Sequence, residues 1–328
     1  MREVVFLKNN AEKWKKFEAL ISEKENNDPD LLAELFIQLT DDLSYARTFY
    51  PGSKTYKYLN SLTAKVHQNI YKNKKEEKGK FIKFWKDELP LLFYTHRKLL
   101  LISFIIFFVS LLIGIISTAN DDKFVRLILG DSYVNMTMEN IAKGDPMAVY
   151  KKMNQVDMFM GITFNNIVVS FYTFMAGILL AFGTGYMLFT NGIMLGSFEC
   201  FFFQHGVLTQ SLLTVWIHGV LEISSIIIAG GAGLLLGKSI LFPGTFTRRK
   251  SFINGAKDGI KIIIGLVPIF ITAGFFESFV TRYTNMPLPV SLLIIFGSLS
   301  FIIWYVVIYP RKIVSRDLNG KDRIQKSS

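Results

Sequence analysis

The sequence predicts an all-α, polytopic membrane protein: a bundle of about six transmembrane helices with an N-terminal cytoplasmic helical domain. Three observations lead to this prediction. Of the 328 residues, 50% are hydrophobic, and they concentrate in one contiguous part of the chain. That part divides into six apolar segments, each long enough to cross a hydrocarbon core about 30 Å thick. Lys and Arg residues gather in the connections that would share one side of the membrane.

Residues 1–98 are expected to form the cytoplasmic helical domain. Apolar residues recur at helical spacing in its first helix, at Val4, Leu7, Ala11, Trp14 and Ile21. A second helix is predicted with Asp28 as its cap and Pro29 in its first turn. A third is predicted after the turn at 50–53. A small bundle packed under the membrane is the favoured interpretation, and a partner-docking domain is the alternative.

The end of this domain, residues 81–98, has a character of its own. It reads FIKFWKDELPLLFYTHRK and mixes aromatic rings with cations. Such a mixture is typical of a helix that lies in the membrane interface. We therefore expect an interfacial helix on the cytoplasmic surface.

The transmembrane domain is predicted over residues 99–310, and a basic cytoplasmic tail over 311–328. The six spans are expected at about 99–118, 162–182, 184–204, 211–237, 259–279 and 290–309. A Gly-Thr-Gly turn at 183–185 separates the second span from the third. One long helix kinked at these glycines is the alternative.

The basic residues test this count. They are frequent in the first 98 residues, after the fourth span and in the tail. With six spans, all three regions fall on the inner side, together with both termini. Residues 119–160 then form an outer loop. Because this loop is amphipathic and rich in methionine, we expect it to lie on the outer membrane surface or to cap the bundle.

Composition and motifs exclude several functions. The net charge is +11, but the basic residues flank the spans, so the lipid bilayer and not nucleic acid is the expected partner. The single cysteine, Cys200, cannot form an intrachain disulfide. The chain has no HExxH, GxSxG or Walker A motif. Two histidines in or near the spans, without Cys or Asp at ligand spacing, are a weak metal signal. We expect no enzyme activity, no metal and no cofactor.

Small residues at four-residue spacing mark the third and fourth spans. Such residues let helix backbones approach closely in lipid. We assign helix packing to Gly192, Gly196, Gly219, Gly233 and Gly237. Packing of the third span against the fourth is the favoured interpretation, and a homodimer face is the alternative.

Polar residues inside the spans are the candidate functional site. They are Asn165, Asn166, Asn191, Glu199, His218, Glu222 and Glu277. Glu222 lies near the middle of its span, with His218 four residues earlier on the same helix face. A carboxylate at that depth costs roughly a few kcal/mol, so it usually faces a bundle interior or a wet cavity. Glu199 and Glu277 fall near span ends, where they could reach interfacial water.

Two interpretations of this polar set remain open. The residues could bind a cation, relay protons or engage a partner's helix. They could instead be hydrogen-bonded clamps between helices, with Asn191 capping a helix break. For Glu222 the sequence favours neither interpretation, and for the other residues it favours the clamp.

Several blocks of the sequence resemble the stage II sporulation protein M family. They are NNIVVSFYTFMAGILLAFGTGYMLFTNGIMLGSF, HGVLEISSIIIAGGAGLLLG and AGFFESF, in the family's order. The N-terminal region looks like the extension of members outside spore formers. The family motif falls on Asn165, Asn191, Gly192, Gly196, His218, Gly219, Glu222 and Glu277. Ile217 stands where the family often has proline, which leaves that helix less broken here.

The resemblance implies a multi-span protein of the bacterial inner membrane. In spore formers the namesake works with cell-wall-degrading partners and is thought to anchor them. We therefore expect a non-enzymatic scaffold or assembly factor of an envelope or cell-wall complex. Its expected partners are other membrane or envelope proteins and a second copy of itself. A transporter or permease subunit that uses Glu222 and His218 as a cation or proton site is the alternative.

Overall fold

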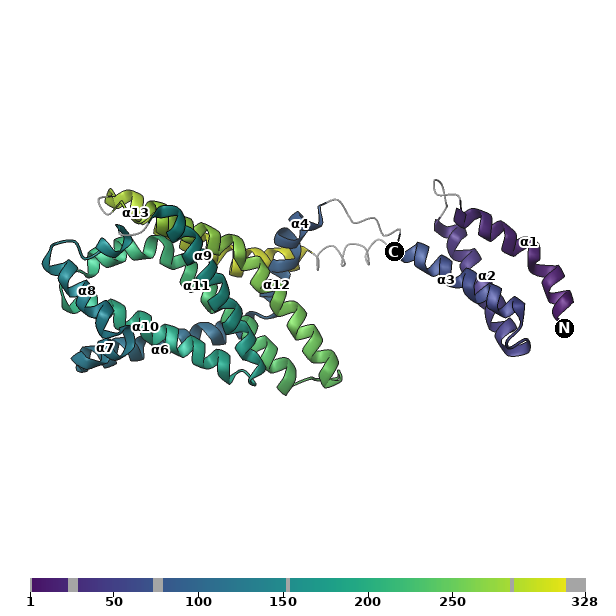
Figure 1. The fold of residues 1–328 in the computed structure, drawn as a ribbon, viewed down its shortest axis with the longest axis horizontal. Helices are drawn as coiled ribbons and strands as arrows, with labels where there is room; N and C mark the ends of the chain where they lie inside the picture. Colours follow the sequence, from purple (N-terminus) through teal and green to yellow (C-terminus); the bar gives the residue numbers. More distant parts are fainter. Residues whose placement is uncertain (1, 23–28, 73–78, 152–153, 284–285, 317–328) are drawn as a thin grey trace. The chain divides into compact units, whose positions relative to one another are not determined.

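The computed structural model describes residues 2–22, 29–72, 79–151, 154–283 and 286–316, and these are helical with short turns and no strand (Figure 1). The all-α prediction is confirmed. The chain divides into two compact units, Met1–Lys80 and Phe81–Ser328. Each unit has a hydrophobic core of its own.

The N-terminal unit contains three helices. They are α1 (Glu3–Ser22), α2 (Pro29–Phe49) and α3 (Lys54–Lys72). Its buried core comprises Phe6, Trp14, Phe17, Leu39, Ala46, Leu59 and Leu62. The Trp14 indole is both packed and hydrogen-bonded, because Nε1 donates to Asp42 Oδ2 at 2.8 Å. The unit is therefore held by apolar burial and by a polar link between α1 and α2.

The predicted apolar stripe on α1 was partly wrong. Trp14 is buried, but Val4 and Leu7 are exposed, and Phe6 and Phe17 take the core positions. The face of α1 that packs inward carries Phe6, Asn10, Trp14 and Phe17. Asn10 is polar, with its Nδ2 bonded back to Phe6 O, so this face does not appear as an apolar pattern in the sequence. The predicted cap Asp28 and the side chain of Ile21 lie outside the described residues.

The segment after Lys80 packs with the membrane helices. It contains α4 (Lys80–Lys83), the π-helical turn η1 (Phe84–Glu88) and α5 (Leu89–Thr95). Leu89 and Phe93 are fully buried in the core of the second unit. Trp85 ties the segment to two other helices, since its Nε1 donates to Gly265 O at 3.3 Å and its carbonyl accepts from Tyr305 Oη at 2.6 Å. The first unit thus ends before this segment, and not at residue 98.

Within its described residues, the second unit contains six helices long and apolar enough to cross a membrane, as predicted. They are α6 (Arg97–Asn120), α9 with η3 (Gln155–Ile178), α10 (Phe182–Gln204), α11 (Leu208–Leu241), α12 with η4 (Arg248–Val280) and α13 with η5 (Leu288–Arg316). The longest, α11, contacts all five others. It is therefore the central element of the unit.

The second and third spans are separate helices. The α9 helix (Gln155–Met175) continues into the 3₁₀ turn η3 (Ala176–Ile178), and α10 starts at Phe182. The chain reverses at Leu180 and Ala181, whose φ angles of 53° and 71° are unusual for residues other than glycine. The predicted Gly-Thr-Gly turn is instead part of α10, where Thr184 Oγ1 donates to Thr173 O at 2.8 Å.

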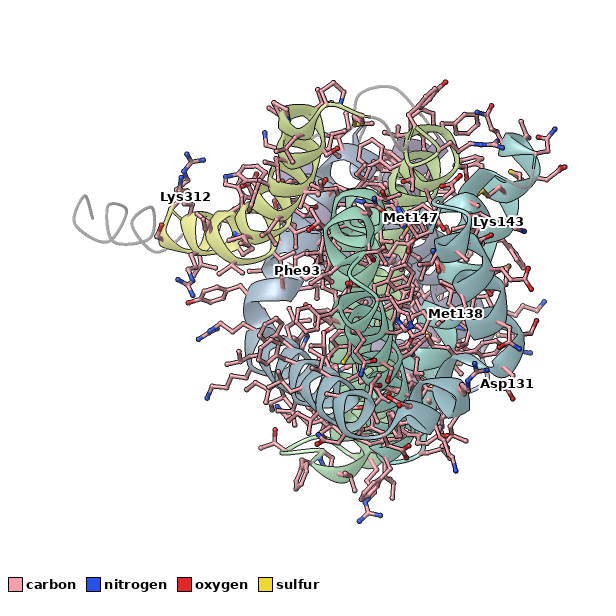
Figure 2. All side chains as sticks on the ribbon, turned by 90° about the vertical axis from the view of Figure 1, so that its left-hand side faces the viewer. Phe93, Asp131, Met138, Lys143, Met147 and Lys312 are labelled. Carbon is pink, nitrogen blue, oxygen red and sulfur yellow. The ribbon has the colours of Figure 1, made fainter. Side chains whose placement is uncertain are left out.

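The connection between the first two spans caps one end of α10. It forms α7 (Asp122–Leu129), α8 (Asp131–Ala142) and the short η2 (Ala148–Lys151). Val125, Val134 and Met147 pack with Phe201 and Phe202 at the end of α10. Figure 2 shows Asp131, Met138 and Lys143 along the edge of the unit. The cap is shorter than the predicted loop 119–160, because α9 already begins at Gln155.

Glycines set the closest helix contacts, but with partners other than those predicted. A Cβ on Gly192 would lie 2.7 Å from Phe107 O of α6, and one on Gly196 would collide with Leu111 O of the same helix. The third span therefore packs on the first through these glycines, and not on the fourth.

The glycines of α11 divide into two groups. A Cβ on Gly233 would lie 2.7 Å from Thr173 O, and one on Gly237 would lie 2.7 Å from the Ala181 side chain, so both face the α9–α10 turn. Gly219 has only ordinary contacts within its own helix, the nearest at 3.8 Å, and its assignment to helix packing was wrong. Gly192, Gly196, Gly233 and Gly237 all face other segments of the same chain. They are therefore not available as the contact face of a homodimer.

We expect Gly196→Ala to lower the free energy of unfolding by about 1–3 kcal/mol, because the added methyl group meets backbone that moves only if α6 shifts. Gly185→Ala on the same helix is the control, since nothing lies within 4 Å of its Cβ position. Thermal unfolding in detergent compares the two variants. Equal stability of both variants would contradict the α6–α10 seam.

Candidate intramembrane polar site

Two elements, α11 and the end of the fifth span, bring ionisable side chains together inside the membrane unit. His218 and Glu222 lie one turn apart on α11. The last turn of the fifth span widens into the π-helix η4 (Phe276–Val280), in which Thr281 N bonds to Phe276 O at 2.8 Å. Such π-bulges often occur at functional sites because they re-aim a side chain. Here η4 carries Glu277 toward α11.

The three ionisable groups form one cluster. His218, Glu222 and Glu277 each offer a ligand atom, and these atoms lie within 4.8 Å of one another. His218 Nε2 lies 3.9 Å from Glu277 Oε1. The His218 side chain is 4% exposed, and the Glu277 side chain is 14% exposed. Glu277 therefore points toward His218 and is largely buried.

Neighbouring polar groups fix the orientation of the cluster. Asn166 on α9 donates from Nδ2 to Glu222 Oε1 at 2.5 Å. On the other side, His218 Nδ1 is hydrogen-bonded to Thr281 Oγ1 at 3.1 Å. The polar site thus joins the second, fourth and fifth spans. Each side chain in it has at least one neighbour that restricts its rotamers.

Two buried serines lie close to the cluster residues along the chain. Ser225 lies one turn beyond Glu222 on α11, and Ser278 follows Glu277 in η4; both residues are fully buried. Their Oγ atoms have no hydrogen-bond partner in the described part of the chain. Buried hydroxyls normally find a partner, since leaving one without a bond costs about 1–3 kcal/mol. The helices near the cluster therefore bury two hydroxyl groups whose hydrogen bonds the protein itself does not supply within the described residues.

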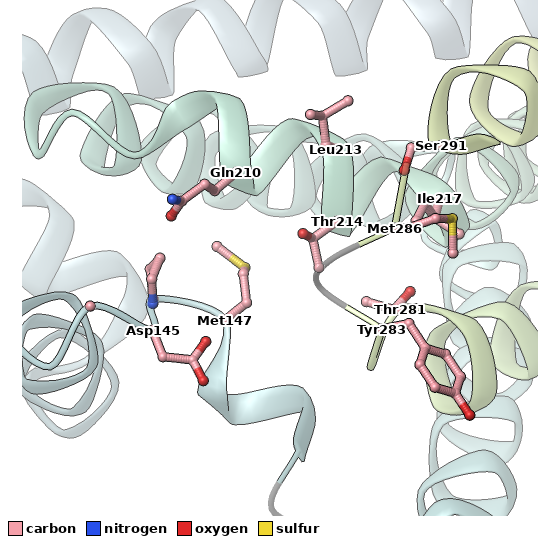
Figure 3. A pocket seen from close by; sticks show the side chains of 12 residues that line it. Asp145, Met147, Gln210, Leu213, Thr214, Ile217, Thr281, Tyr283, Met286 and Ser291 are labelled. Atoms are coloured by element: carbon pink, nitrogen blue, oxygen red, sulfur yellow. The ribbon is translucent and has the colours of Figure 1, made fainter. Parts of the chain in front are cut away.

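A cavity of about 290 Å³ lies beside Thr281, the hydrogen-bond partner of His218. Figure 3 shows the side chains that line this cavity. It lies between the loop that follows α8, the start of α11 and the segment after η4. The lining residues include Asp145, Met147, Gln210, Thr214, Ile217, Thr281 and Tyr283. Thr281 is also the hydrogen-bond partner of His218, and Ile217 is its neighbour in the chain. The Thr281 side chain therefore lies between the cavity and His218.

The remaining candidate residues have other surroundings. Asn165 is exposed, and its neighbour Asn166 makes the contact to Glu222. Asn191 bonds back to Met187 O of its own helix at 2.7 Å, so it caps no helix break. Glu199 accepts from Trp216 Nε1 at 2.8 Å, and its Oε2 is buried without a partner among the described residues. It links α10 to α11 as a clamp.

Sequence reasoning missed the role of Thr281. The residue follows the fifth span and carries no charge, so nothing in the apolar pattern marks it. A usable signal was its position four residues after Glu277, on the same side of a helical turn. No residue spacing in the sequence predicts the π-bulge η4 that brings Glu277 and Thr281 to His218.

A comparison with known families matches residues 103–282 to the family described as Stage II sporulation protein M. The chain belongs to this family. The matched region contains every residue of the polar cluster, so the stage II sporulation protein M domain holds the whole site. A separate match covers residues 4–72 and is described as a domain of unknown function, DUF8413. No curated protein and no solved structure matches the chain.

We expect Asn166→Leu to destabilise this family member by about 1–3 kcal/mol, because it removes the donor that Glu222 uses within the bundle. Asn165→Leu is the matched control, since the adjacent side chain is exposed. Thermal unfolding of the two variants in the same detergent tests the difference. If Asn165→Leu were as harmful as Asn166→Leu, the Asn166–Glu222 contact would not be what stabilises the bundle.

Proposed function

We propose that the chain is a non-enzymatic scaffold or assembly factor of a bacterial envelope complex, held in the cytoplasmic membrane with both termini inside. The observation that carries this proposal is its construction from two compact units. A three-helix domain with its own core precedes a six-helix membrane unit. The two regions also match two separate families. A membrane anchor with an appended helical module is suited to hold a partner at the membrane.

The N-terminal unit offers a specific contact surface. Phe6, Tyr45 and Phe49 form an aromatic group at the start of α1 and the end of α2, with ring centroids 5.0 Å apart for Phe6–Tyr45 and 4.5 Å apart for Tyr45–Phe49. Phe49 is 59% exposed. Exposed aromatic rings on a rigid helix are typical anchors of protein interfaces. The partner on this surface would be a membrane or envelope protein, and not nucleic acid.

The packing of α11 also favours a scaffold over an open pathway. Every residue of Ile228–Gly237 is buried, and this stretch lies between the polar cluster and the end of the helix. The cavity beside the cluster stops at Thr281. In this conformation the cluster is approached from one end of the bundle and closed toward the other.

A photoreactive amino acid at Phe49 of the full chain, in living bacteria, tests the scaffold. We expect it to give a discrete adduct with an envelope protein. Ile37, which is 60% exposed on the same helix but faces another direction, is the control position. Equal adducts from both positions would contradict the proposed surface. An envelope complex that assembles normally in cells whose chain lacks residues 1–72 would overturn the scaffold proposal.

The polar cluster supports a second candidate function, a transporter or permease subunit in which Glu222 and His218 bind or relay a cation or proton. Carboxylates at membrane depth often mark ion pathways. We expect transport, if the chain performs it, to require the carboxylate of Glu222.

Proteoliposomes that contain the full chain test this candidate through proton or metal-ion flux. Glu222→Gln should abolish flux while the folded protein persists, and Glu199→Gln should leave it intact. Flux that is absent in the wild type, or unaffected by Glu222→Gln, would rule out the transport candidate.

A further inference from the structure

We infer that His218, Glu222 and Glu277 form a binding site for one divalent first-row transition-metal ion, of the Zn²⁺ or Mn²⁺ type. The cluster would bind this ion whether the chain acts as a scaffold or as a transporter. The donor atoms lie within 4.8 Å of one another. Around a metal ion with ligand bonds of about 2.1 Å, donors lie about 3–3.5 Å apart. Side-chain rotations that close the cluster by about an ångström complete the site.

Charge balance favours a divalent ion. The cluster contains two carboxylates, one imidazole and the neutral amide of Asn166, which donates to Glu222. None of these four groups carries a permanent positive charge. Two carboxylates this close repel each other strongly where water is scarce. One divalent cation between them, with a neutral imidazole, makes the site electrically neutral, which is the state that costs least inside a membrane.

The surroundings of His218 fit a metal ligand. A ligating histidine normally uses its second ring nitrogen for a hydrogen bond that fixes the ring. Here Nδ1 is bonded to Thr281 Oγ1 at 3.1 Å, and Nε2 is turned toward Glu277 Oε1 at 3.9 Å. Asn166 holds Glu222 in the same manner. Thr281 and Asn166 thus each hold one of the donor groups in place.

Two buried hydroxyls provide a second, independent observation. Ser225 lies on the face of α11 that carries His218 and Glu222, and Ser278 adjoins Glu277. Each is fully buried, and its Oγ has no partner in the described part of the chain. Hydroxyls so placed can donate to the metal-bound carboxylates or to a metal-bound water.

The donor types select the metal. Imidazole suits Zn²⁺, Fe²⁺, Ni²⁺ and Cu²⁺, whereas Mg²⁺ and Ca²⁺ prefer sites made only of oxygen. One nitrogen with two carboxylates therefore excludes tight binding of Mg²⁺ and Ca²⁺. Zn²⁺ should bind more tightly than Mn²⁺ because affinity rises along the first-row series. The cavity that shares Thr281 with the site lies beside it at one end of the bundle, and the Thr281 side chain stands between the cavity and His218.

Titration of the purified, chelator-treated full chain with Zn²⁺, Mn²⁺ and Mg²⁺ tests the site. We expect one Zn²⁺ per chain, weaker Mn²⁺, little Mg²⁺, and a higher Tm in the presence of Zn²⁺. Glu277→Gln and Glu222→Gln should weaken Zn²⁺ binding about 100-fold, and Thr281→Val about 10-fold through the orientation of His218. Glu199→Gln, a buried carboxylate of α10 outside the cluster, should bind as the wild type does.

Several results would overturn the site. They are a wild type that binds no stoichiometric Zn²⁺ and whose Tm does not change, equal binding of Mg²⁺ and Zn²⁺, or the same loss of affinity from Glu199→Gln. The wild-type Tm shift needs no variant, so the test remains decisive if a glutamate variant fails to fold. Crosslinking at Phe49 reports on the scaffold separately, so failure of one proposal is distinguished from failure of the other.

Discussion

Close backbone contact at glycine is the constraint on which the membrane unit depends. Lipid tails are as apolar as leucine, so burial of apolar surface does little to hold membrane helices together, and van der Waals packing must do more. Gly192 and Gly196 bring α10 against α6, and Gly233 and Gly237 bring α11 against the α9–α10 turn. The turn itself is strained at Leu180 and Ala181, which have positive φ angles. Ala181 holds that conformation beside Gly237, where only a glycine leaves room.

This packing explains why the polar cluster occupies one half of the bundle. The stretch Ile228–Gly237 of α11 is buried throughout, and small residues there leave no space for water or ions. Glu222 lies six residues before this stretch, and the π-helix η4 widens the end of the fifth span. The closed half fixes the helices, and the fixed helices position His218, Glu222 and Glu277 within 4.8 Å of one another.

In the proposed function the N-terminal unit binds the partner and the membrane unit anchors the chain. The N-terminal unit has a stable core around Trp14 and an exposed aromatic ring at Phe49, as expected of a docking module. The membrane unit provides an anchor that contains a charge-rich site. Metal binding there would join the second, fourth and fifth spans through Asn166, Glu222 and Glu277, and so stabilise the folded bundle by mass action.

Periodicity and composition determined the number of spans, the helical nature of the N-terminal region and the depth of Glu222, because these features follow from local apolar patterns. Such patterns do not say which helix lies beside which. The sequence therefore paired Gly192 and Gly196 with the fourth span, while the fold pairs them with α6. It marked Asn165 and Asn166 together, and the family resemblance singled out Asn165, whereas the fold turns Asn166 toward Glu222. The sequence also placed Glu277 near the end of its span, where it could reach interfacial water. Only the tertiary structure, through the π-bulge of η4, turned that carboxylate inward to meet His218, because the position of a side chain on a neighbouring helix depends on packing across the bundle and not on its own segment.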